Sequence, residues 1–168
     1  TGSNQDIKNL TAGSRVFCPV FVTAVNLSFG DLHFSQGDGE ITFCGAIEMG
    51  GFMDLRVDLI KGGMEKYGVR ENAIFMPGLR DPQYSEWIAF SGVSVDSKGK
   101  QHYLDSWLAY QNACNHAIDY MMKFGYTDIQ AYMILGTAPV EGRLSGVVDI
   151  PNACSTIYIP RSIFDFDI

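Results

Sequence analysis

Apolar and polar residues alternate along much of this chain, in the pattern that is typical of β-strands with one buried face. The clearest case is the run from residue 52 to residue 60, where Asp54, Arg56 and Asp58 alternate with apolar residues. Clustered glycines separate such runs and mark turns between them. We therefore predict strands at 15–25, 40–49, 52–60, 86–95 and 155–160.

The alternation stops in residues 103–124, where apolar residues recur at every third or fourth position. This spacing predicts an amphipathic helix, and Gly125 follows it as a C-terminal cap. Thr127 and Gln130 have the spacing of a capping box, so a second helix is expected to begin there and to end near residue 135. The whole pattern predicts a β-rich α+β fold, with sandwich- or barrel-like sheets and an inserted helical hairpin.

Composition narrows the classes of protein that this chain can belong to. Its 168 residues are 46% hydrophobic and 18% charged, which suits one folded domain or a large piece of a bigger one. The formal net charge of −7 argues against nucleic acid and against an anionic membrane surface as partners. No apolar run is long enough to span a bilayer, and the first residues lack the apolar core of a signal peptide. Four cysteines lie far apart in the chain: Cys18, Cys44, Cys114 and Cys154. We therefore expect buried free thiols and a cytoplasmic protein.

The stretch GDLHFSQGDGE, residues 30–40, concentrates acidic residues and a histidine around glycines. Its Asp38-Gly39 pair favours a two-residue hairpin turn, which would place His33 opposite Cys44 and Ser35 opposite Thr42. That register collects four apolar side chains on a buried face: Leu32, Phe34, Ile41 and Phe43. The opposite face is polar and carries Asp31, His33, Ser35, Glu40, Thr42 and Cys44.

Three interpretations of this polar face are open from the residues alone. It can be an ordinary solvated face of a hairpin. It can be a metal or acid/base cluster, because Asp31 and His33 point the same way from a strand and can share a divalent metal, while Glu40 handles protons. It can also be a nucleophilic site in which Cys44 is paired with His33.

Longer segments of the chain resemble the acetamidase/formamidase family. They are GDLHFSQGDGEITFCGAIEM, VDLIKGG, YLDSWLAYQNAC, FGYTDIQAYMILGTAPVEGRLSGVVDIPNA and IFDFDI, and TGSNQDIKNL resembles the family's Gly-Gly-Asn-x-Asp segment with Ser3 in place of the second glycine. The resemblance implies an acetamidase/formamidase-like fold, hydrolysis of a short amide and a homo-oligomer. The segment from Phe43 to Glu48 is similar to the formamidase branch, which makes formamide the expected substrate.

Members of the family are longer, so residues 1–168 resemble their C-terminal, catalytic part. The N-terminal part of the same protein is then expected as a partner of this chain. The start at Thr1 also raises the alternative of cleavage before this residue, with Thr1 as an N-terminal nucleophile. We expect the chain to be insoluble or inactive without its N-terminal part.

The polar positions that match the family's motif are Asn4, Asp6, Asp31, His33, Asp38 and Glu40. The resemblance leads us to expect a divalent metal, zinc, held by Asp6, Asp31 and His33. Glu40 would move the proton, Asp38 would orient His33 or the metal, and Asn4 would contact the substrate.

Two further alternatives remain at this point. One is a cysteine amidase with Cys44 as nucleophile, Glu40 or Glu48 as base, and Lys61 stabilising charge. The other is a β-rich binding or assembly module that has kept the fold and lost the activity.

Overall fold

The computed structural model describes residues 5–43, 47–78 and 83–168 and divides the chain into two compact units. The first unit comprises Thr1–Leu32 and Met49–Gln83, and the second comprises His33–Glu48 and Tyr84–Ile168. The chain thus passes from the first unit into the second, back into the first and again into the second.

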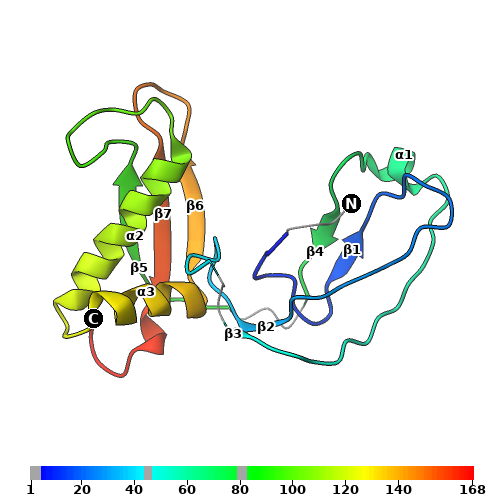
Figure 1. Ribbon diagram of the computed structural model, residues 1–168, viewed down its shortest axis with the longest axis horizontal. Helices are drawn as coiled ribbons and strands as arrows, with labels where there is room; N and C mark the ends of the chain where they lie inside the picture. The colour runs from blue at the N-terminus through cyan, green and yellow to red at the C-terminus, as the bar shows by residue number, and fades with distance from the viewer. Residues whose placement is uncertain (1–4, 44–46, 79–82) are drawn as a thin grey trace. The chain divides into compact units, whose positions relative to one another are not determined.

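The larger sheet of the second unit contains β5 (Trp87–Val93), β6 (Glu141–Gly146) and β7 (Cys154–Pro160). All pairs are antiparallel, and β7 lies in the middle of the order β5–β7–β6 (Figure 1). On β7, Ile157 and Ile159 are almost completely buried, whereas Tyr158 between them is half-exposed. The sheet therefore has one core face and one wetter face, as antiparallel sheets commonly do.

The predicted helical hairpin is confirmed, with α2 at Ser106–Met122 and α3 at Asp128–Thr137. Asp105 caps α2 by accepting a hydrogen bond from the Leu108 N–H at 3.0 Å. The capping box predicted for Thr127 and Gln130 is present at the start of α3. A short 3₁₀ helix, η1 (Arg161–Ile163), follows β7.

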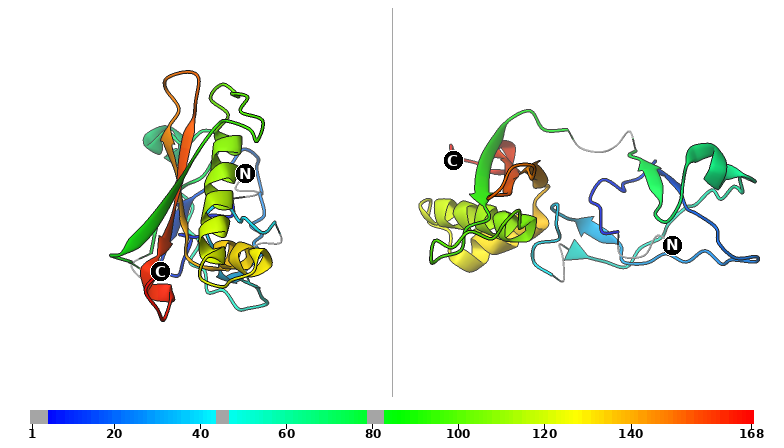
Figure 2. Two further views of the ribbon diagram at one scale, coloured as in Figure 1. Left: turned by 90° about the vertical axis from the view of Figure 1, so that its left-hand side faces the viewer. Right: turned by 90° about the horizontal axis from the view of Figure 1, so that it is seen from above.

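Small residues let α2 lie close against one face of the sheet (Figure 2). Ala109, Ala113 and Ala117 recur every four positions on α2 and are completely buried. Opposite them on β5, a Cβ on Gly92 would lie 2.3 Å from the Ala109 carbonyl oxygen and 2.3 Å from the Ala113 nitrogen. The core of the second unit forms around this contact, from Phe90, Ala113, Cys114, Ala117, Met121, Ala131, Leu135, Val140, Ile157 and Ile159.

The first unit has little regular structure in its described residues. β1 (Arg15–Phe17) pairs antiparallel with β4 (Ile74–Met76), and α1 (Gly63–Tyr67) precedes β4. The strand predicted at 15–25 is thus confined to its first three residues.

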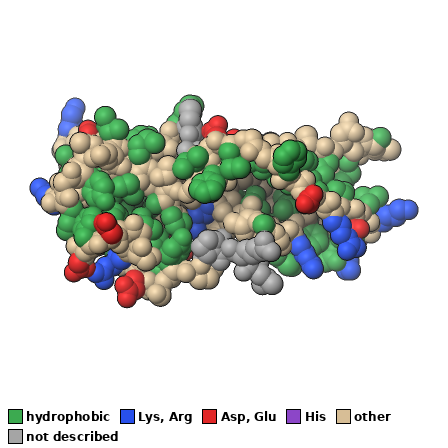
Figure 3. Space-filling view, turned by 90° about the horizontal axis from the view of Figure 1, so that it is seen from below, with side chains coloured by type: hydrophobic (Ala, Val, Ile, Leu, Met, Phe, Trp, Pro, Cys, Tyr) green, Lys and Arg blue, Asp and Glu red, His purple; other side chains and the backbone are tan. Residues whose placement is uncertain are grey.

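The strand predicted at 52–60 is wrong, because these residues form no strand and all of them are exposed, including their apolar members. Figure 3 shows apolar side chains spread over one face of the molecule. Alternation alone does not make a strand, since a strand also needs a neighbour that pairs with its backbone groups. The strands predicted at 86–95 and 155–160 are confirmed within two residues, as Trp87–Val93 and Cys154–Pro160. The sequence pattern did not indicate β4 or β6.

Two expectations from composition can be compared with the structure. Cys114 is buried, but Cys18 is exposed and Cys154 is half-buried, so the prediction of uniformly buried thiols is wrong. Within the described part of the chain, none of the helices combines the length and the apolar character needed to cross a bilayer.

Candidate functional site

The motif stretch begins with a short antiparallel pair in the second unit. β2 (His33–Ser35) pairs with β3 (Ile47–Glu48), and this pairing places His33 opposite Glu48. The predicted hairpin register, which placed His33 opposite Cys44, is therefore wrong. Residues 36–43, the described part of the segment between the two strands, form a loop that contains a turn at Asp38-Gly39 but no further strand pairing, and the ladder is irregular between its two registered pairs.

The loop departs from the predicted hairpin because it docks on the end of α3. The last carbonyl groups of a helix have no partner within the helix. Here the Ser35 hydroxyl donates to the Thr137 carbonyl oxygen, and the Gly37 N–H donates to the Gly136 carbonyl oxygen at 3.1 Å. The Gly37 N–H, which would have paired with Glu40 in the predicted hairpin, therefore caps α3 instead, while the Gly37 carbonyl oxygen still accepts from the Glu40 N–H.

This docking also changes which apolar side chains are buried. Phe34 is 75% exposed and Phe43 is 87% exposed, although both were predicted on a buried face. Leu32 is half-buried, and Ile41 packs against the core of the second unit. The predicted common apolar face of the hairpin is therefore wrong, and Ile41 is the residue that anchors the loop to the core.

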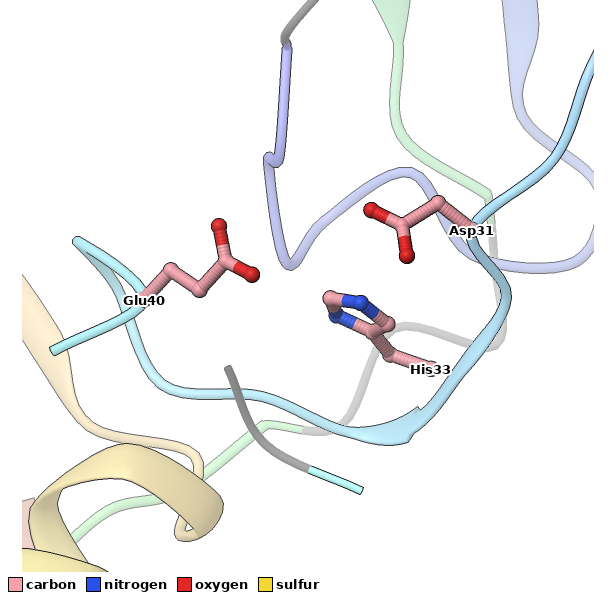
Figure 4. A group of neighbouring side chains, drawn as sticks. All are labelled: Asp31, His33 and Glu40. Atoms are coloured by element: carbon pink, nitrogen blue, oxygen red, sulfur yellow. The ribbon is translucent and has the colours of Figure 1, made fainter. Parts of the chain in front are cut away.

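The structure brings together three of the motif residues, Asp31, His33 and Glu40 (Figure 4). Each offers one ligand atom, and these atoms all lie within 4.8 Å of one another. His33 and Glu40 are half-buried and Asp31 is exposed. In Figure 4 both carboxylates point toward the imidazole ring, so one imidazole and two acidic groups converge within a single stretch of ten residues.

The surroundings of His33 suit it for binding a metal ion. Its Nδ1 atom lies 2.7 Å from Oε1 of Gln36. In the tautomer that carries a proton on Nδ1, this nitrogen donates to Gln36 and the lone pair remains on Nε2. A hydrogen bond from the second ring nitrogen is the usual support for a metal-binding histidine. A histidine with two carboxylates is also a donor set that Zn²⁺ accepts.

Glu40 and Asp31 reach the cluster from unusual backbone conformations. Their φ angles are +44° and +59°, in the left-handed region that side chains other than glycine seldom occupy. The backbone turns tightly on both sides of Glu40. The Glu40 N–H donates to the Gly37 carbonyl oxygen, and the Glu40 carbonyl oxygen accepts from the Phe43 N–H. Such conformations persist where the surrounding structure holds them, and they are common at functional sites.

Asp38, whose carboxylate we predicted to orient His33 or the metal, has a hydrogen-bond partner on β6. Its Oδ2 atom accepts a hydrogen bond from the Gly142 N–H at 2.8 Å, which ties the loop to β6. Its backbone N–H donates to the Val140 carbonyl oxygen at 2.9 Å. Gln36 contacts the His33 ring through Nδ1.

The remaining predicted site residues are distributed differently. Asp6 is half-buried in the first unit and is not one of the three residues of the cluster. Asn4 and Cys44 lie outside the described residues, as does Thr1. Lys61 is exposed in the first unit.

Two charged pairs of the second unit lie outside the cluster. Arg143 and Glu141 form an exposed ion pair at 2.8 Å, and the Arg143 guanidinium stacks on the ring of Tyr158. The carboxylate of Asp96 accepts from His102 and from the N–H groups of its own turn, which lowers the pKa of Asp96.

Sequence reasoning missed three residues that shape the site. Gln36 contacts the His33 ring, the Tyr110 hydroxyl donates to the Asp38 carbonyl oxygen at 2.8 Å, and the Tyr132 hydroxyl donates to the Ile41 carbonyl oxygen at 3.0 Å. The only sequence signal was the position of Gln36 three residues after His33. The tyrosine contacts join residues 72 and 91 positions apart, so no local pattern could reveal them.

Taken together, the fold and the cluster define a β-rich protein in which one imidazole and two carboxylates converge. Comparison with known proteins makes this more specific. The model of the Acetamidase/Formamidase family matches residues 1–166, and the chain belongs to this family.

Individual relatives agree with that assignment. The chain is 62% identical to a formamidase of Methylophilus methylotrophus over 167 residues, which are 99% of this chain and 41% of the relative. It is 65% identical to an acetamidase of Mycolicibacterium smegmatis over 142 residues, which are 84% of this chain and 35% of the relative. The structure matches the gamma lactamase from Delftia acidovorans with a TM-score of 0.93 and 62% identity, over 96% of this chain and 40% of that one.

These comparisons confirm the predicted fold class, since a solved structure with 62% identity has the same fold over 96% of this chain. They also show that the chain spans about two fifths of the length of the relatives that it matches.

Proposed function

We propose that this chain contributes the active site of an amidohydrolase that cleaves a short aliphatic amide, preferably formamide, to ammonia and the carboxylate. The observation that carries the proposal is the convergence of Asp31, His33 and Glu40 within 4.8 Å. Relatives named formamidase and acetamidase, at 62% and 65% identity, support the choice of reaction.

Amide hydrolysis presents two chemical difficulties that these residues can address. Resonance makes the amide carbonyl a poor electrophile, and the departing amine must receive a proton. A divalent cation, zinc in our proposal, would polarise the carbonyl and acidify the attacking water when bound. His33 and Asp31 would hold it, with Gln36 fixing the His33 tautomer, and Asp6 stays a predicted third ligand.

Glu40 is the residue that we assign to proton transfer. Its carboxylate accepts the proton from the attacking water, and the same proton then goes to the nitrogen as the carbon–nitrogen bond breaks. The position suits this role, since the Glu40 carboxylate converges with His33 and Asp31. Glu40 lies on the loop that is hydrogen-bonded to Gly136 and Val140, so its position depends on these contacts with the rest of the second unit.

The central test replaces Glu40 by Gln in the full-length enzyme and measures ammonia release from formamide together with bound metal. We expect E40Q to lose roughly a hundredfold or more in kcat, as removal of a general base does, while keeping its metal. Glu48→Gln is the matched control, since Glu48 is an exposed carboxylate on the strand opposite His33 and should keep its activity. An E40Q enzyme with normal kcat would refute the proposed role of Glu40.

Two further variants separate metal chemistry from thiol chemistry. His33→Ala should lose both the metal and the activity, and chelation of the wild-type enzyme should have the same effect. Cys44→Ala should keep most of its activity, because this mechanism assigns Cys44 no role. Activity that survives chelation but disappears in C44A would favour a cysteine amidase instead.

The first unit supports a second part of the proposal, which concerns partners. Many of its large apolar side chains are exposed, among them Phe21, Val22, Leu27, Phe29, Phe52, Val57 and Leu59. We propose that these side chains pack against the part of the longer family protein that this chain does not span, and that the whole protein forms a homo-oligomer. Light scattering on the full-length protein should give a mass of more than one chain, and a monomer would refute the oligomer.

The same surface can be probed with a hydrophobic dye. The isolated 168-residue chain should bind the dye ANS strongly, whereas the full-length protein should bind little. Equal dye binding by both would contradict the proposed packing.

A further inference from the structure

The backbone around Glu40 is held in place by two tyrosine hydroxyl groups from two different helices. Tyr110 of α2 donates to the carbonyl oxygen of Asp38, two residues before Glu40, at 2.8 Å. Tyr132 of α3 donates to the carbonyl oxygen of Ile41, one residue after Glu40, at 3.0 Å. Both contacts lie within the second unit.

Tyr110 also fits closely between two glycines. A Cβ on Gly39 would lie 3.0 Å from the Tyr110 hydroxyl oxygen, and a Cβ on Gly142 would lie 2.6 Å from the same atom. Gly39 has a φ of +87°, so glycine suits this position for its conformation as well as for its size. The ring is therefore wedged between the loop before Glu40 and the start of β6.

The hydroxyl group of Tyr110 remains a hydrogen-bond donor throughout the working range of an enzyme. Burial is the main cause that raises the pKa of Tyr110 above its usual value. A phenol that keeps its proton can serve as a permanent donor to a backbone carbonyl.

We propose that Tyr110, assisted by Tyr132, positions Glu40 for proton transfer. The inference rests on the proposed function, in which Glu40 carries the proton. Glu40 occupies a left-handed conformation that must be maintained by its neighbours, and these hydroxyl groups fix the carbonyls on either side of it. A misplacement of about 1 Å can cost on the order of a hundredfold in rate, so loss of either anchor should be visible in kcat.

The test compares Tyr110→Phe and Tyr132→Phe with Tyr126→Phe in the full-length enzyme. Each change removes one hydroxyl oxygen and keeps the ring. Tyr126 is the matched control, since its ring packs against Phe164 and Phe166 at the far end of the helical hairpin. We expect kcat on formamide to fall roughly three- to tenfold for Y110F, and less for Y132F because Tyr132 is exposed. Y126F should match the wild-type enzyme, and KM and bound metal should stay unchanged in all three variants.

Combining each change with Glu40→Gln separates positioning from a merely structural role. If Tyr110 acts through Glu40, Y110F should have little further effect on the residual kcat of E40Q, because the two changes remove the same step. If Tyr110 only stabilises the fold, the two effects should multiply. Multiplication, or a Y110F enzyme with normal kcat, would overturn the inference.

The same set of variants distinguishes this inference from the proposed function. A large loss in E40Q with normal kcat in Y110F and Y132F overturns the positioning role alone. Normal kcat in E40Q overturns the role of Glu40 and, with it, the inference. Thermal unfolding of each variant supplies a readout besides activity, and a kcat loss that appears only where unfolding has begun at the assay temperature also counts against positioning.

Discussion

Removing the carboxylate of Asp38 should destabilise the protein without abolishing the chemistry. Asp38 belongs to the motif stretch, yet its Oδ2 atom accepts from the Gly142 N–H at 2.8 Å and so joins the loop to β6. Asp38→Ala removes this acceptor and leaves the Gly142 N–H without its partner. Asp38→Asn keeps an oxygen that can accept the same hydrogen bond.

The size of the effect follows from the type of bond. Hydrogen bonds to charged groups contribute about 1.5–3 kcal/mol to the free energy of unfolding, and neutral ones about 0.5–1.5 kcal/mol. The loss of the charged bond in D38A should therefore lower Tm by roughly 3–12 °C, at about 2–4 °C per kcal/mol for a chain of 168 residues. D38N should lie between D38A and the wild-type protein. The backbone contacts of Asp38 remain in both variants, so the loop should stay docked.

Differential scanning calorimetry and steady-state kinetics on the full-length enzyme together show whether Asp38 has a structural or a catalytic role. A structural role predicts that D38N keeps kcat within about threefold of the wild-type value, since a general acid or base would contribute about 10²–10⁴-fold. A D38N enzyme with unchanged Tm and a kcat lowered more than a hundredfold would refute the structural role and make Asp38 a catalytic residue.

Two further predictions concern the body that carries the site. Gly92→Ala should lower the free energy of unfolding in urea by about 1–3 kcal/mol or more, because the new Cβ would lie 2.3 Å from backbone atoms of α2. Gly146→Ala is the control and should have little effect, because its new Cβ would lie 3.9 Å from the nearest atom. Asp96 has a pKa below its ordinary value of 3.8, so its stabilising contribution is present above that pH and is lost as pH falls through the folded-state pKa. The Tm difference between wild type and Asp96→Asn should therefore shrink below about pH 4, and a difference independent of pH would contradict the assignment.

The sequence predicted local features well. The two helices follow from apolar spacing and from Thr127 and Gln130, and these signals lie within a few residues of one another. The residues of the cluster were also found from a single stretch, because Asp31, His33 and Glu40 are close in the chain.

Features that depend on distant residues could not be predicted in this way. The hairpin register failed because the Gly37 N–H bonds to Gly136 instead of to Glu40, and Asp38 has its partner in Gly142, 104 positions away. β6 was missed because its sequence EGRLSG shows no alternation, and its pairing with β7 makes it a strand. Conversely, residues 52–60 alternate well and have no strand partner in the described structure.

The central position of β7 in its sheet also determines when the site can form during synthesis. β5 and β6 both pair with β7 and not with each other, yet β7 comes after both of them in the chain. A ribosome that has made the motif stretch, both helices and β6 therefore still holds a sheet without its middle strand. The loop that bears Glu40 docks on residues 136–142, and β6, which begins within them, pairs with β7. We therefore expect the loop to dock only after β7 has been made. Contacts between distant parts of a chain form slowly, and apolar surface stays exposed until they form. We therefore expect chaperones to bind the nascent chain until β7, which ends at Pro160, has emerged.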